Sequence, residues 1–379
     1  MTVAAHPVTT DAGAAPDTAG LRAVAARCAE RTEQERRLPA EVVEALGAAG
    51  FARHLVPARW GGTEGSFRAL LDAVAEVGES CASTAWNAAV HAILGRMVSH
   101  LPEQGLREIW GEGPDELFAG SIAPAGEVTE VDGGHRLSGR WPFASGVDHA
   151  SWTLLGAMAP GPEYRFFMVP RAHYRILDSW TNVGLGGTGS NSVLLDDVFV
   201  PGHLSYPQAA LMAGAAAGQA ACRRVPFKLV NGLTFVAPVL GAARGALRSS
   251  AARLAVKTEI NGGAARANPA VQTALARAGA EIDAAQLLLE RAAAVADGGA
   301  AGALERARAP RDFAFAAELL GAAVDRLFRI GGARSQTTSD PVQRAWRDVN
   351  CAAGHAVLQF GSVAGVFTTH LMDGVHQDV

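Results

Sequence analysis

Lysine is almost absent from this 379-residue chain, which carries only Lys228 and Lys257, so nearly all of its positive charge is on arginine. Its 33 lysine and arginine residues are outnumbered by 37 acidic residues, which gives a formal net charge of −4. A protein that binds nucleic acid non-specifically needs a basic surface to neutralise phosphates. The charge balance therefore argues against a nucleic-acid partner.

Cysteine is also scarce, and the four thiols are far apart in the sequence: Cys28, Cys81, Cys222 and Cys351. No CxxC pair or Cys/His cluster is present, so we predict reduced thiols, no disulfide framework and no metal site. No apolar run reaches the roughly 18 residues that a membrane span needs. Residues 1–20 lack the basic start and apolar stretch of a signal peptide, so we expect a flexible tail and a cytoplasmic protein.

Hydrophobic periodicity divides the rest of the chain into three regions. Residues 21–116 have helical spacing, as in the apolar series from Phe67 to Val74 behind a cap at Ser66. Residues 117–206 contain short strand-like runs, with Asp132-Gly133 as a hairpin turn. Residues 207–379 are predicted to form four or more long alanine-rich helical segments, with breaks at Gly262-Gly263, Gly298-Gly299, Gly331-Gly332 and Ser339-Asp340-Pro341. Because helices and strands are segregated along the chain, this order predicts an α+β multidomain fold.

The same order argues against a dinucleotide-binding fold, in which strands and helices alternate. The stretch GLGGTGS, from Gly184 to Ser190, superficially resembles a phosphate-binding loop. However, it precedes a predicted strand, whereas such a loop must lead into a helix. We therefore do not interpret it as a nucleotide-binding motif.

Three segments resemble the acyl-CoA dehydrogenases and occur in that family's order: RWPFASGVDHASW, GLGGTGSNSVLLDDVFVP and FRIGGARS. The resemblance extends over roughly residues 20–375. It implies an N-terminal helical domain, a middle β domain and a C-terminal four-helix bundle. In the family, the first segment faces the flavin ring and the paired glycines of the third approach the flavin from the bundle.

The chain departs from true acyl-CoA dehydrogenases at the catalytic position. Those enzymes have a glutamate shortly after an Arg-Asp pair, whereas here Arg347-Asp348 is followed by VNCAAGHAVLQF, with His355 near the expected place. Without a carboxylate base, removal of an α-proton from an acyl thioester has no obvious agent. An Arg-Asp pair with a histidine seven residues on resembles the two-component flavin monooxygenases that share this fold.

Within that group, CASTAWNAAVHAILGRM, WPFASGVDHASW and WRDVNCAAGHAVLQF look most like the actinorhodin-pathway hydroxylases of pyranonaphthoquinones. The resemblance implies a monooxygenase of antibiotic biosynthesis that hydroxylates a phenolic polyketide through a C4a-hydroperoxyflavin. Its cofactor would be reduced FMN, with FAD as the alternative, and O2 the cosubstrate. It further implies a separate NAD(P)H:flavin reductase and a homotetramer.

Three residues are the candidate catalytic groups that this resemblance supplies. Ser145 would bond to flavin N5 and slow the loss of peroxide; the alternative is a turn serine that satisfies its own backbone. His355, expected on a helix after Trp346, would stabilise the flavin peroxide as a cation or donor, or else is a surface or core histidine. His91 would act on the substrate hydroxyl as a base, or else pack in the core; its helix is expected to begin near a Ser83-Thr84 cap.

Further residues are candidates for contact with the flavin or the substrate. The predicted flavin contacts, besides Ser145, are Trp141, Phe143, Gly146, Thr188, Gly189, Ser190, Gly331, Gly332 and Arg334. Trp86 and Ser121 are predicted to line the substrate pocket with His91. Arg334, Arg224 and Lys228 are equally suited to pair with the flavin phosphate.

Three other functions stay open at this point. An acyl-CoA dehydrogenase-type flavoenzyme would hold FAD tightly and be reduced by acyl-CoA. An N-oxygenase of an amino sugar would share the flavin machinery and differ in the substrate pocket. A non-enzymatic flavin-binding protein would retain these residues without using them for turnover.

Overall fold

The computed structural model describes residues 13–214, 219–260 and 262–375. Residues 1–12 of the expected N-terminal tail lie outside this range. The first helix begins at Thr18, where Asp17 accepts a hydrogen bond from the Ala19 amide at 3.1 Å. The prediction of a tail through residue 20 was therefore wrong at its end, because an aspartate cap starts the helix earlier.

The N-terminal region is helical, as predicted. Its helices are α1 (Thr18–Glu35), α2 (Ala40–Ala48), α3 (Phe67–Gly78), α4 (Ala82–Val98) and α5 (Glu103–Trp110). The predicted cap of α3 is confirmed, since Ser66 Oγ accepts a hydrogen bond from the Ala69 amide at 3.0 Å. The predicted cap of α4 was wrong: the helix starts after Cys81, so Ser83 and Thr84 lie inside its first turn.

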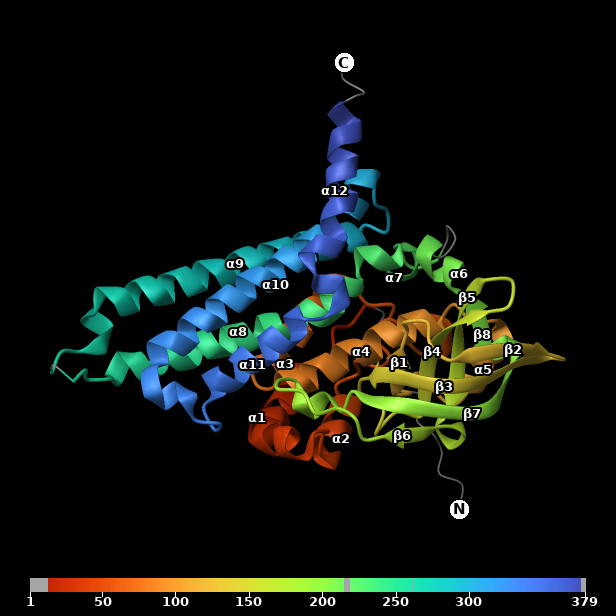
Figure 1. The fold of residues 1–379 in the computed structure, drawn as a ribbon, viewed down its shortest axis with the longest axis horizontal. Helices are drawn as coiled ribbons and strands as arrows, with labels where there is room; N and C mark the ends of the chain where they lie inside the picture. Colours follow the sequence, from red (N-terminus) through yellow and green to blue (C-terminus); the bar gives the residue numbers. More distant parts are fainter. Residues whose placement is uncertain (1–12, 215–218, 261, 376–379) are drawn as a thin grey trace.

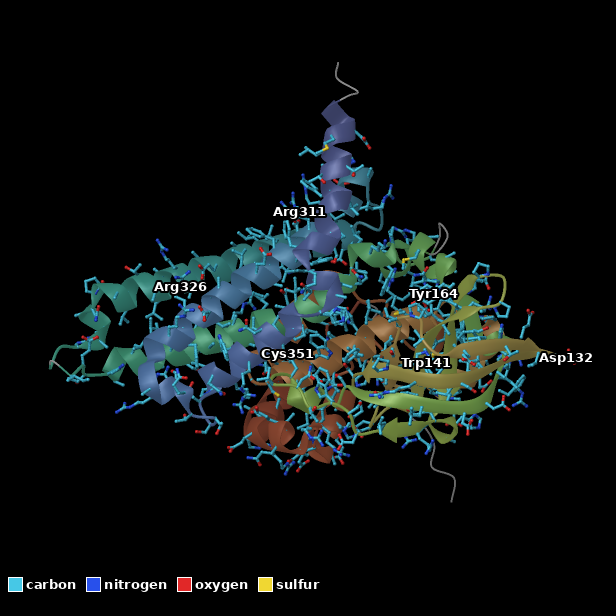
Figure 2. All side chains as sticks on the ribbon, viewed as in Figure 1. Asp132, Trp141, Tyr164, Arg311, Arg326 and Cys351 are labelled. Atoms are coloured by element: carbon cyan, nitrogen blue, oxygen red, sulfur yellow. The ribbon has the colours of Figure 1, made fainter. Side chains whose placement is uncertain are left out.

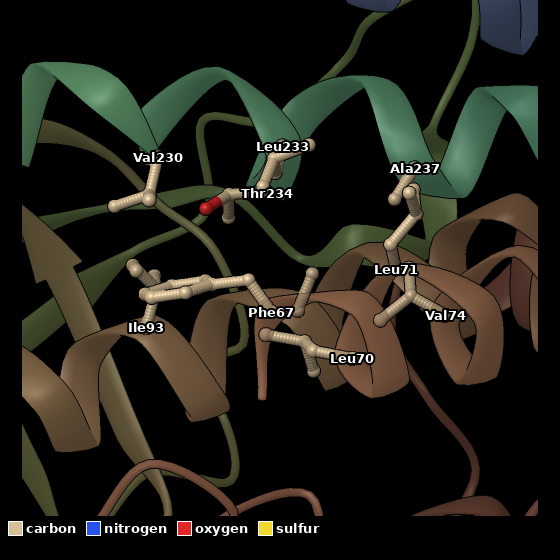
Figure 3. A pocket seen from close by; sticks show the side chains of 10 residues that line it. Phe67, Leu70, Leu71, Val74, Ile93, Val230, Leu233, Thr234 and Ala237 are labelled. Atoms are coloured by element: carbon tan, nitrogen blue, oxygen red, sulfur yellow. The ribbon is translucent and has the colours of Figure 1, made fainter. Parts of the chain in front are cut away.

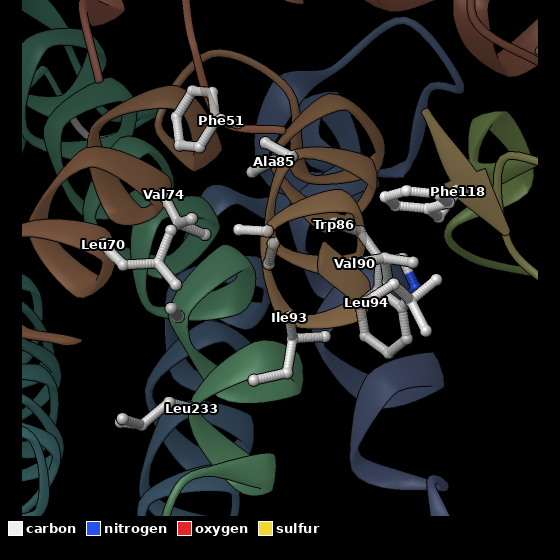
Figure 4. Packing of buried hydrophobic residues seen from close by; sticks show 14 of the residues in the cluster. Phe51, Leu70, Val74, Ala85, Trp86, Val90, Ile93, Leu94, Phe118 and Leu233 are labelled. Atoms are coloured by element: carbon white, nitrogen blue, oxygen red, sulfur yellow. The ribbon is translucent and has the colours of Figure 1, made fainter. Parts of the chain in front are cut away.

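Helix α4 lies at the centre of the molecule. Every one of its 17 residues is buried, and it packs against α3, α8 and the first strand of the β domain. Figure 4 shows Ile93 of α4 beside Leu70 of α3 and Leu233 of α8. A helix that is buried on all sides can hold polar side chains at fixed positions, because each one is surrounded by packed neighbours.

The middle region consists of two four-stranded sheets. Their strands are β1 (Phe118–Ser121), β2 (Glu127–Val131), β3 (Gly134–Ala144), β4 (Trp152–Ala159), β5 (Glu163–Pro170), β6 (Arg175–Leu177), β7 (Asn191–Pro201) and β8 (Ser205–Pro207). One sheet has the order β1-β4-β5-β8, with β1 parallel to β4 and the other pairs antiparallel. The other has the order β2-β3-β7-β6 and is antiparallel throughout.

The predicted hairpin at Asp132-Gly133 is confirmed. These two residues join β2 to β3, and Gly133 has a φ of +76°, which its lack of a Cβ permits. Figure 2 shows Asp132 at the outer tip of this hairpin and Trp141 inside the β domain. The GLGGTGS turn leads into β7, so the prediction that it precedes a strand is also confirmed.

The C-terminal region is a helical bundle built from α8 (Asn231–Val256), α9 (Pro269–Asp297), α10 (Ala303–Gly331) and α11 (Pro341–Ala353). The short helices α6 (Gln208–Ala213) and α7 (Ala221–Arg224) lead into it, and α12 (Phe360–Val375) projects away from it (Figure 1). The breaks expected at Gly298-Gly299, Gly331-Gly332 and Ser339-Asp340-Pro341 are confirmed. The 3₁₀ turns are η1 (Ala58–Trp60), η2 (Arg171–His173), η3 (Gly186–Thr188), η4 (Gly202–Leu204), η5 (Phe227–Leu229), η6 (Ala265–Ala267), η7 (Gly332–Gln336) and η8 (Ala356–Leu358).

These regions lie side by side, with the sheets at one end, the bundle at the other and the N-terminal helices between them (Figure 1). The expected α+β fold, with helices on either side of a β domain in the sequence, is confirmed. One segment, Phe227–Val256, is long and apolar enough to span a membrane by composition alone. However, 78% of its most apolar window is buried inside the protein, which is typical of a core helix.

Candidate active site

Ser145 lies in a strained turn at the end of β3. The pairing of β3 with β7 is irregular between Trp141 and Ala144, and Phe143 has a φ of +64°, which is rare for a bulky residue. Phe143 is 68% exposed, and its ring forms a T-shaped pair with the ring of Trp180 at a centroid distance of 6.2 Å. Strain of this kind persists where the surrounding structure imposes it and clusters at ligand-binding sites. Phe143 therefore presents an aromatic surface next to Ser145.

The turn then passes directly over α4. Gly146 has a φ of +72°, and a Cβ there would lie 2.4 Å from Asn87 Oδ1 and 3.3 Å from His91 Cε1. Only glycine allows this approach. The structure thus brings Ser145 and Gly146 against the helix that carries His91, as the predicted site requires.

A chain of hydrogen bonds connects Ser145 to the glycine-rich turn. Trp86 Nε1 donates to Ser145 Oγ at 3.0 Å, and Ser145 Oγ lies 2.7 Å from Ser190 Oγ. Ser190 Oγ lies 2.7 Å from Thr188 Oγ1, which donates to the Leu185 carbonyl at 2.8 Å. We call the hydroxyls of Ser145, Ser190 and Thr188 the hydroxyl relay. Three of the predicted flavin contacts are therefore bonded in a chain, Ser145 to Ser190 and Ser190 to Thr188.

Helix α11 fixes the start of the glycine-rich turn. Asp348 Oδ1 accepts a hydrogen bond from the Leu185 amide at 2.6 Å, and Arg347 donates to the Val183 carbonyl at 2.8 Å. Burial raises the pKa of Asp348 to about 6, because a charged carboxylate is poorly solvated there. The Arg-Asp pair, used above only as a family landmark, thus positions the turn that carries the relay.

His91 is enclosed in α4 beside Gly146. Its Nδ1 lies 2.8 Å from the Phe118 carbonyl, which can only accept, so Nδ1 carries the ring proton. Burial lowers the pKa of His91 to about 4, and the ring is therefore neutral near pH 7. Its Nε2 consequently has a lone pair and can accept a proton or a hydrogen bond.

His355 follows α11 and is not part of a helix, so the predicted helical placement was wrong. The helix ends at Ala353, and His355 caps the turn η8 by accepting a hydrogen bond from the Val357 amide on Nδ1. The ring proton is therefore on Nε2, which can donate. Burial lowers the pKa of His355 to about 4, which favours the donor role over the cationic role at neutral pH, and its role toward the flavin stays a prediction.

An aromatic cluster joins His355 to the relay. The His355 ring stacks on Phe235 of α8 at a centroid distance of 3.9 Å, and Phe235 lies 5.1 Å from Trp86. Because Trp86 also bonds to Ser145, residues from α4, α8, β3 and the turn after α11 meet in one place. The predicted residues Trp86, His91, Ser145 and His355 are thus brought together from three separate segments, and Phe235 of α8 completes the cluster.

Two predicted contact residues have other partners. Trp141 is completely buried and donates to the Gly156 carbonyl at 2.8 Å, so it packs the β domain and its indole presents no surface to a flavin. The Ser121 hydroxyl donates to the Pro142 carbonyl at 2.6 Å, next to Phe143. Ser121 therefore supports the strained turn, and its proton is not free for a substrate.

The structure does not bring the glycine pair of the bundle to this site within one chain. Gly331 and Gly332 lie where α10 ends, at the end of the bundle remote from the sheets (Figure 1). Gly331 packs there against Ser335 and Arg253, and Arg334 is exposed in η7. Of the other candidate cations, Arg224 donates to the Gln219 carbonyl at 2.6 Å. The choice among these cations stays a prediction.

Three residues of the site were missed by the sequence reasoning. Asn87 lies four residues before His91 on α4, and this i, i+4 spacing could have indicated that both share a face. Its Oδ1 is buried without a partner in the described part of the chain. Phe235 and Asp348 carry no local signal, because their contacts come from packing between distant segments.

Two cavities lie away from this cluster. One, of about 10 Å³, is a packing gap between α3, α4 and α8, lined by Phe67, Leu70 and Leu233 among others (Figure 3). It is too small for more than a water molecule. The other, of about 620 Å³, is an open groove lined by Lys228, Arg306 and His370 among others. Neither is lined by Ser145, His91 or His355.

All four cysteines are free thiols. Within the described ranges, no group of three or more His, Cys, Asp or Glu side chains could hold a metal ion.

Comparisons with known proteins agree with this geometry. The models of the acyl-CoA dehydrogenase N-terminal domain and C-terminal domain match residues 20–110 and 233–360. The structure of XiaF from Streptomyces sp. in complex with FADH2 and glycerol superposes with a TM-score of 0.88. It is 27% identical in sequence, and the match covers 93% of each chain. These matches define the class as the acyl-CoA dehydrogenase fold.

Relatives define the group more narrowly. The flavin-dependent monooxygenase oxygenase subunit HsaA of Mycobacterium tuberculosis is 34% identical over 361 residues, covering 90% of this chain and 91% of that protein. The oxygenase component of the FADH2-dependent resorcinol hydroxylase of Rhizobium sp. is 34% identical over 371 residues, covering 91% and 90%. The chain belongs to the flavin-dependent monooxygenase oxygenase subunits with the acyl-CoA dehydrogenase fold, and it is an enzyme of that class.

Proposed function

We propose that this chain is the oxygenase component of a two-component system that hydroxylates a polycyclic phenol, a polyketide of the pyranonaphthoquinone type. It would use reduced FMN, with FAD as the alternative, and O2. A separate NAD(P)H:flavin reductase would supply the reduced flavin, since relatives are named as oxygenase subunits or components. We place this chemistry in the cytoplasm and in antibiotic biosynthesis, on the sequence resemblance given above.

The observation that carries the proposal is the state of His91. Its ring lies against Gly146 of the Ser145 turn and, being neutral, holds a lone pair on Nε2 to which a phenol hydroxyl would donate. Withdrawing the phenolic proton makes the ring carbon ortho or para to the oxygen more nucleophilic, which favours attack on an electrophilic oxygen. The segment from Arg347 to Phe360 contains no glutamate, so the dehydrogenase base of this fold has no counterpart in it.

The residues around Ser145 fit a flavin. Phe143 offers an exposed ring for stacking, Ser145 Oγ keeps a free lone pair when it donates to Ser190, and Asn87 Oδ1 is a buried acceptor without a partner among the described residues. When bound and reduced, the flavin would supply the electrophilic oxygen by the C4a-hydroperoxyflavin route. His355 would contribute a neutral Nε2–H donor, and the aromatic cluster of Trp86, Phe235 and His355 would exclude water.

We also propose a homotetramer. Helix α12 projects from the bundle with Val366, Leu371 and Met372 more than half exposed, and such apolar side chains are commonly covered by another chain. A second copy could also bring Gly331, Gly332 and Arg334 to a flavin that they cannot reach within their own chain. Sedimentation velocity at micromolar concentration should give a single species of four chains; a monomer would contradict this assembly.

The function is tested by mixing the protein anaerobically with photoreduced FMN and adding an oxygen pulse in a stopped-flow spectrophotometer. We expect a transient near-ultraviolet band that differs from oxidised flavin, and hydroxylated product when a polycyclic phenol is included. Immediate return to oxidised flavin with and without a phenol panel, together with reduction of bound FAD by acyl-CoA, would contradict the proposal and favour the dehydrogenase.

A further inference from the structure

We propose that the hydroxyl relay gives Ser145 a fixed acceptor role and thereby makes the site select reduced flavin over oxidised flavin. The inference rests on the proposed function, because it concerns how the chain's own residues meet the flavin. It assigns Trp86, Ser190 and Thr188 a positioning role, in which they set the direction of the Ser145 hydroxyl.

The two ends of the relay determine its direction. The Trp86 indole N–H can only donate, and the Leu185 carbonyl can only accept. Each of the three hydroxyls between them has one proton to donate. When Thr188 donates to Leu185, Ser190 donates to Thr188 and Ser145 donates to Ser190, so that every proton has an acceptor. Ser145 then has one lone pair occupied by Trp86 and one left over.

The opposite direction is less favourable in the protein alone. The Leu185 carbonyl would stay satisfied, since it also accepts from Trp180 Nε1 at 2.9 Å and from the Thr188 amide at 3.1 Å. However, the Ser145 proton would then have no acceptor in the relay. The relay is nearly dry, with residue exposures of 7% for Ser145, 5% for Ser190 and 1% for Thr188. An unsatisfied polar group is costly where water cannot replace the missing partner.

The two redox states of flavin differ at N5, the atom that we expect Ser145 to contact. Reduced flavin has an N5–H that donates, whereas N5 of oxidised flavin has a lone pair and can only accept. An acceptor at Ser145 therefore complements the reduced form. To donate to oxidised N5, Ser145, Ser190 and Thr188 must all reverse and Thr188 must give up its bond to Leu185.

The test measures dissociation constants for oxidised FMN and, anaerobically, for photoreduced FMN in the wild type, Thr188→Val and Ser190→Ala. Valine removes the link to Leu185, and alanine removes the acceptor of the Ser145 proton. In both variants the Ser145 hydroxyl is released to donate to oxidised flavin. We expect the ratio of the oxidised to the reduced dissociation constant to fall about tenfold, as expected for one buried hydrogen bond.

Ser192→Ala is the matched control. Ser192 lies on β7 two residues after Ser190, and its Oγ pairs with Ser179 Oγ at 2.8 Å outside the relay. Its loss also removes a buried hydroxyl from this part of the chain, but the ratio should stay at the wild-type value. A ratio that falls equally in this control would overturn the assignment, because a general loosening of β7 would then be the cause.

The midpoint potential of bound FMN gives a second readout that does not depend on turnover. A tenfold fall in the ratio lowers that potential by about 30 mV for a two-electron couple. Wild-type ratios and potentials in both variants would overturn the relay's role while leaving the proposed function intact. If neither redox state binds to the wild type, the proposed function fails and this inference fails with it.

Discussion

His91 and His355 both belong to the cluster around Ser145, but the hydrogen-bonding role of Nε2 differs between the two rings. The residues next to each histidine in the sequence do not reveal this difference. Burial lowers the pKa of each to about 4, so both rings are neutral near pH 7. In His91, Nδ1 donates to the Phe118 carbonyl, which leaves Nε2 as an acceptor. In His355, Nδ1 accepts from the Val357 amide, which leaves Nε2 as a donor.

This contrast shows that the backbone group that faces Nδ1 of each ring decides whether Nε2 accepts or donates a hydrogen bond. A carbonyl from β1 prepares His91 to receive a proton, and an amide from η8 prepares His355 to donate one. A phenol substrate needs an acceptor for its hydroxyl, and a developing negative oxygen needs a donor. The two histidines therefore offer complementary roles at one site although their pKa values are nearly the same.

The largest effect on hydroxylation is expected when the acceptor nitrogen of His91 is removed. His91→Ala should lower the rate of hydroxylation about 100-fold, because general bases typically contribute factors of 10² to 10⁴. Flavin binding and oxygen consumption should continue, with hydrogen peroxide replacing the product. The measurement compares product by mass spectrometry with oxygen uptake for the same phenol.

His100→Ala is the control for this variant. His100 lies just after α4, and burial lowers its pKa to about 4 as well, but it stacks on Tyr206 away from the site. An equal loss of hydroxylation in both variants would show that packing around α4 is responsible. Undiminished coupling in His91→Ala would remove His91 from the reaction and make it a core residue.

A second difference is that the helix before His355 carries a buried carboxylate, whereas α4, which carries His91, has none. Asp348 lies on α11, and burial raises its pKa to about 6 from the ordinary 3.8. The folded protein therefore holds this proton more tightly than the unfolded chain. The stability that Asp348 contributes is complete below about pH 4 and is lost as the pH rises to about 6.

Asp348→Asn should remove this pH dependence while its side-chain oxygen still accepts from the Leu185 amide. Relative to the wild type, the variant should gain on the order of 2 to 3 kcal/mol of unfolding free energy between pH 4 and pH 7. Urea unfolding at a series of pH values measures the change. A difference between the two proteins that does not vary with pH would show that Asp348 is ionised normally.

The smallest effect is expected when the N–H donor of His355 is removed. His355→Ala should increase the fraction of reduced flavin that is oxidised without product about tenfold, consistent with one lost hydrogen bond. His355→Gln, which keeps an N–H donor, should restore part of the coupling. Peroxide yield per flavin oxidised is the measurement. If alanine and glutamine behave alike, the stacking of His355 on Phe235 matters and its proton does not.

Much of the framework could be predicted because its signals are local. The Ser66 cap, the Asp132-Gly133 hairpin and the break at Gly298 each depend on neighbouring residues, and each was confirmed. Predictions were wrong where another residue nearby could take the same structural position. Ser83 and Thr84 look like a cap, but Cys81 precedes the helix in extended conformation and occupies that position.

The roles of site residues were harder to predict, because they depend on what surrounds each side chain. Trp141 and Phe143 are two residues apart in one motif, yet the first is buried and the second is 68% exposed. The irregular pairing of β3 with β7 between Trp141 and Ala144 separates them. No feature of the letters WPFAS shows on which side of the strand such a bulge places each ring.

The amino-acid sequence alone specifies the order of helices and strands, the turns between them and the polar side chains available to the site. These depend on periodicity and turn chemistry, which act over a few residues. The ring tautomers and the direction of the hydroxyl relay depend instead on how distant segments pack together. Trp86 and Ser145 are 59 positions apart, and Leu185 and Asp348 are 163 apart. Hydrogen-bond roles across such separations exist only after the core has packed and removed the water that would otherwise satisfy each group.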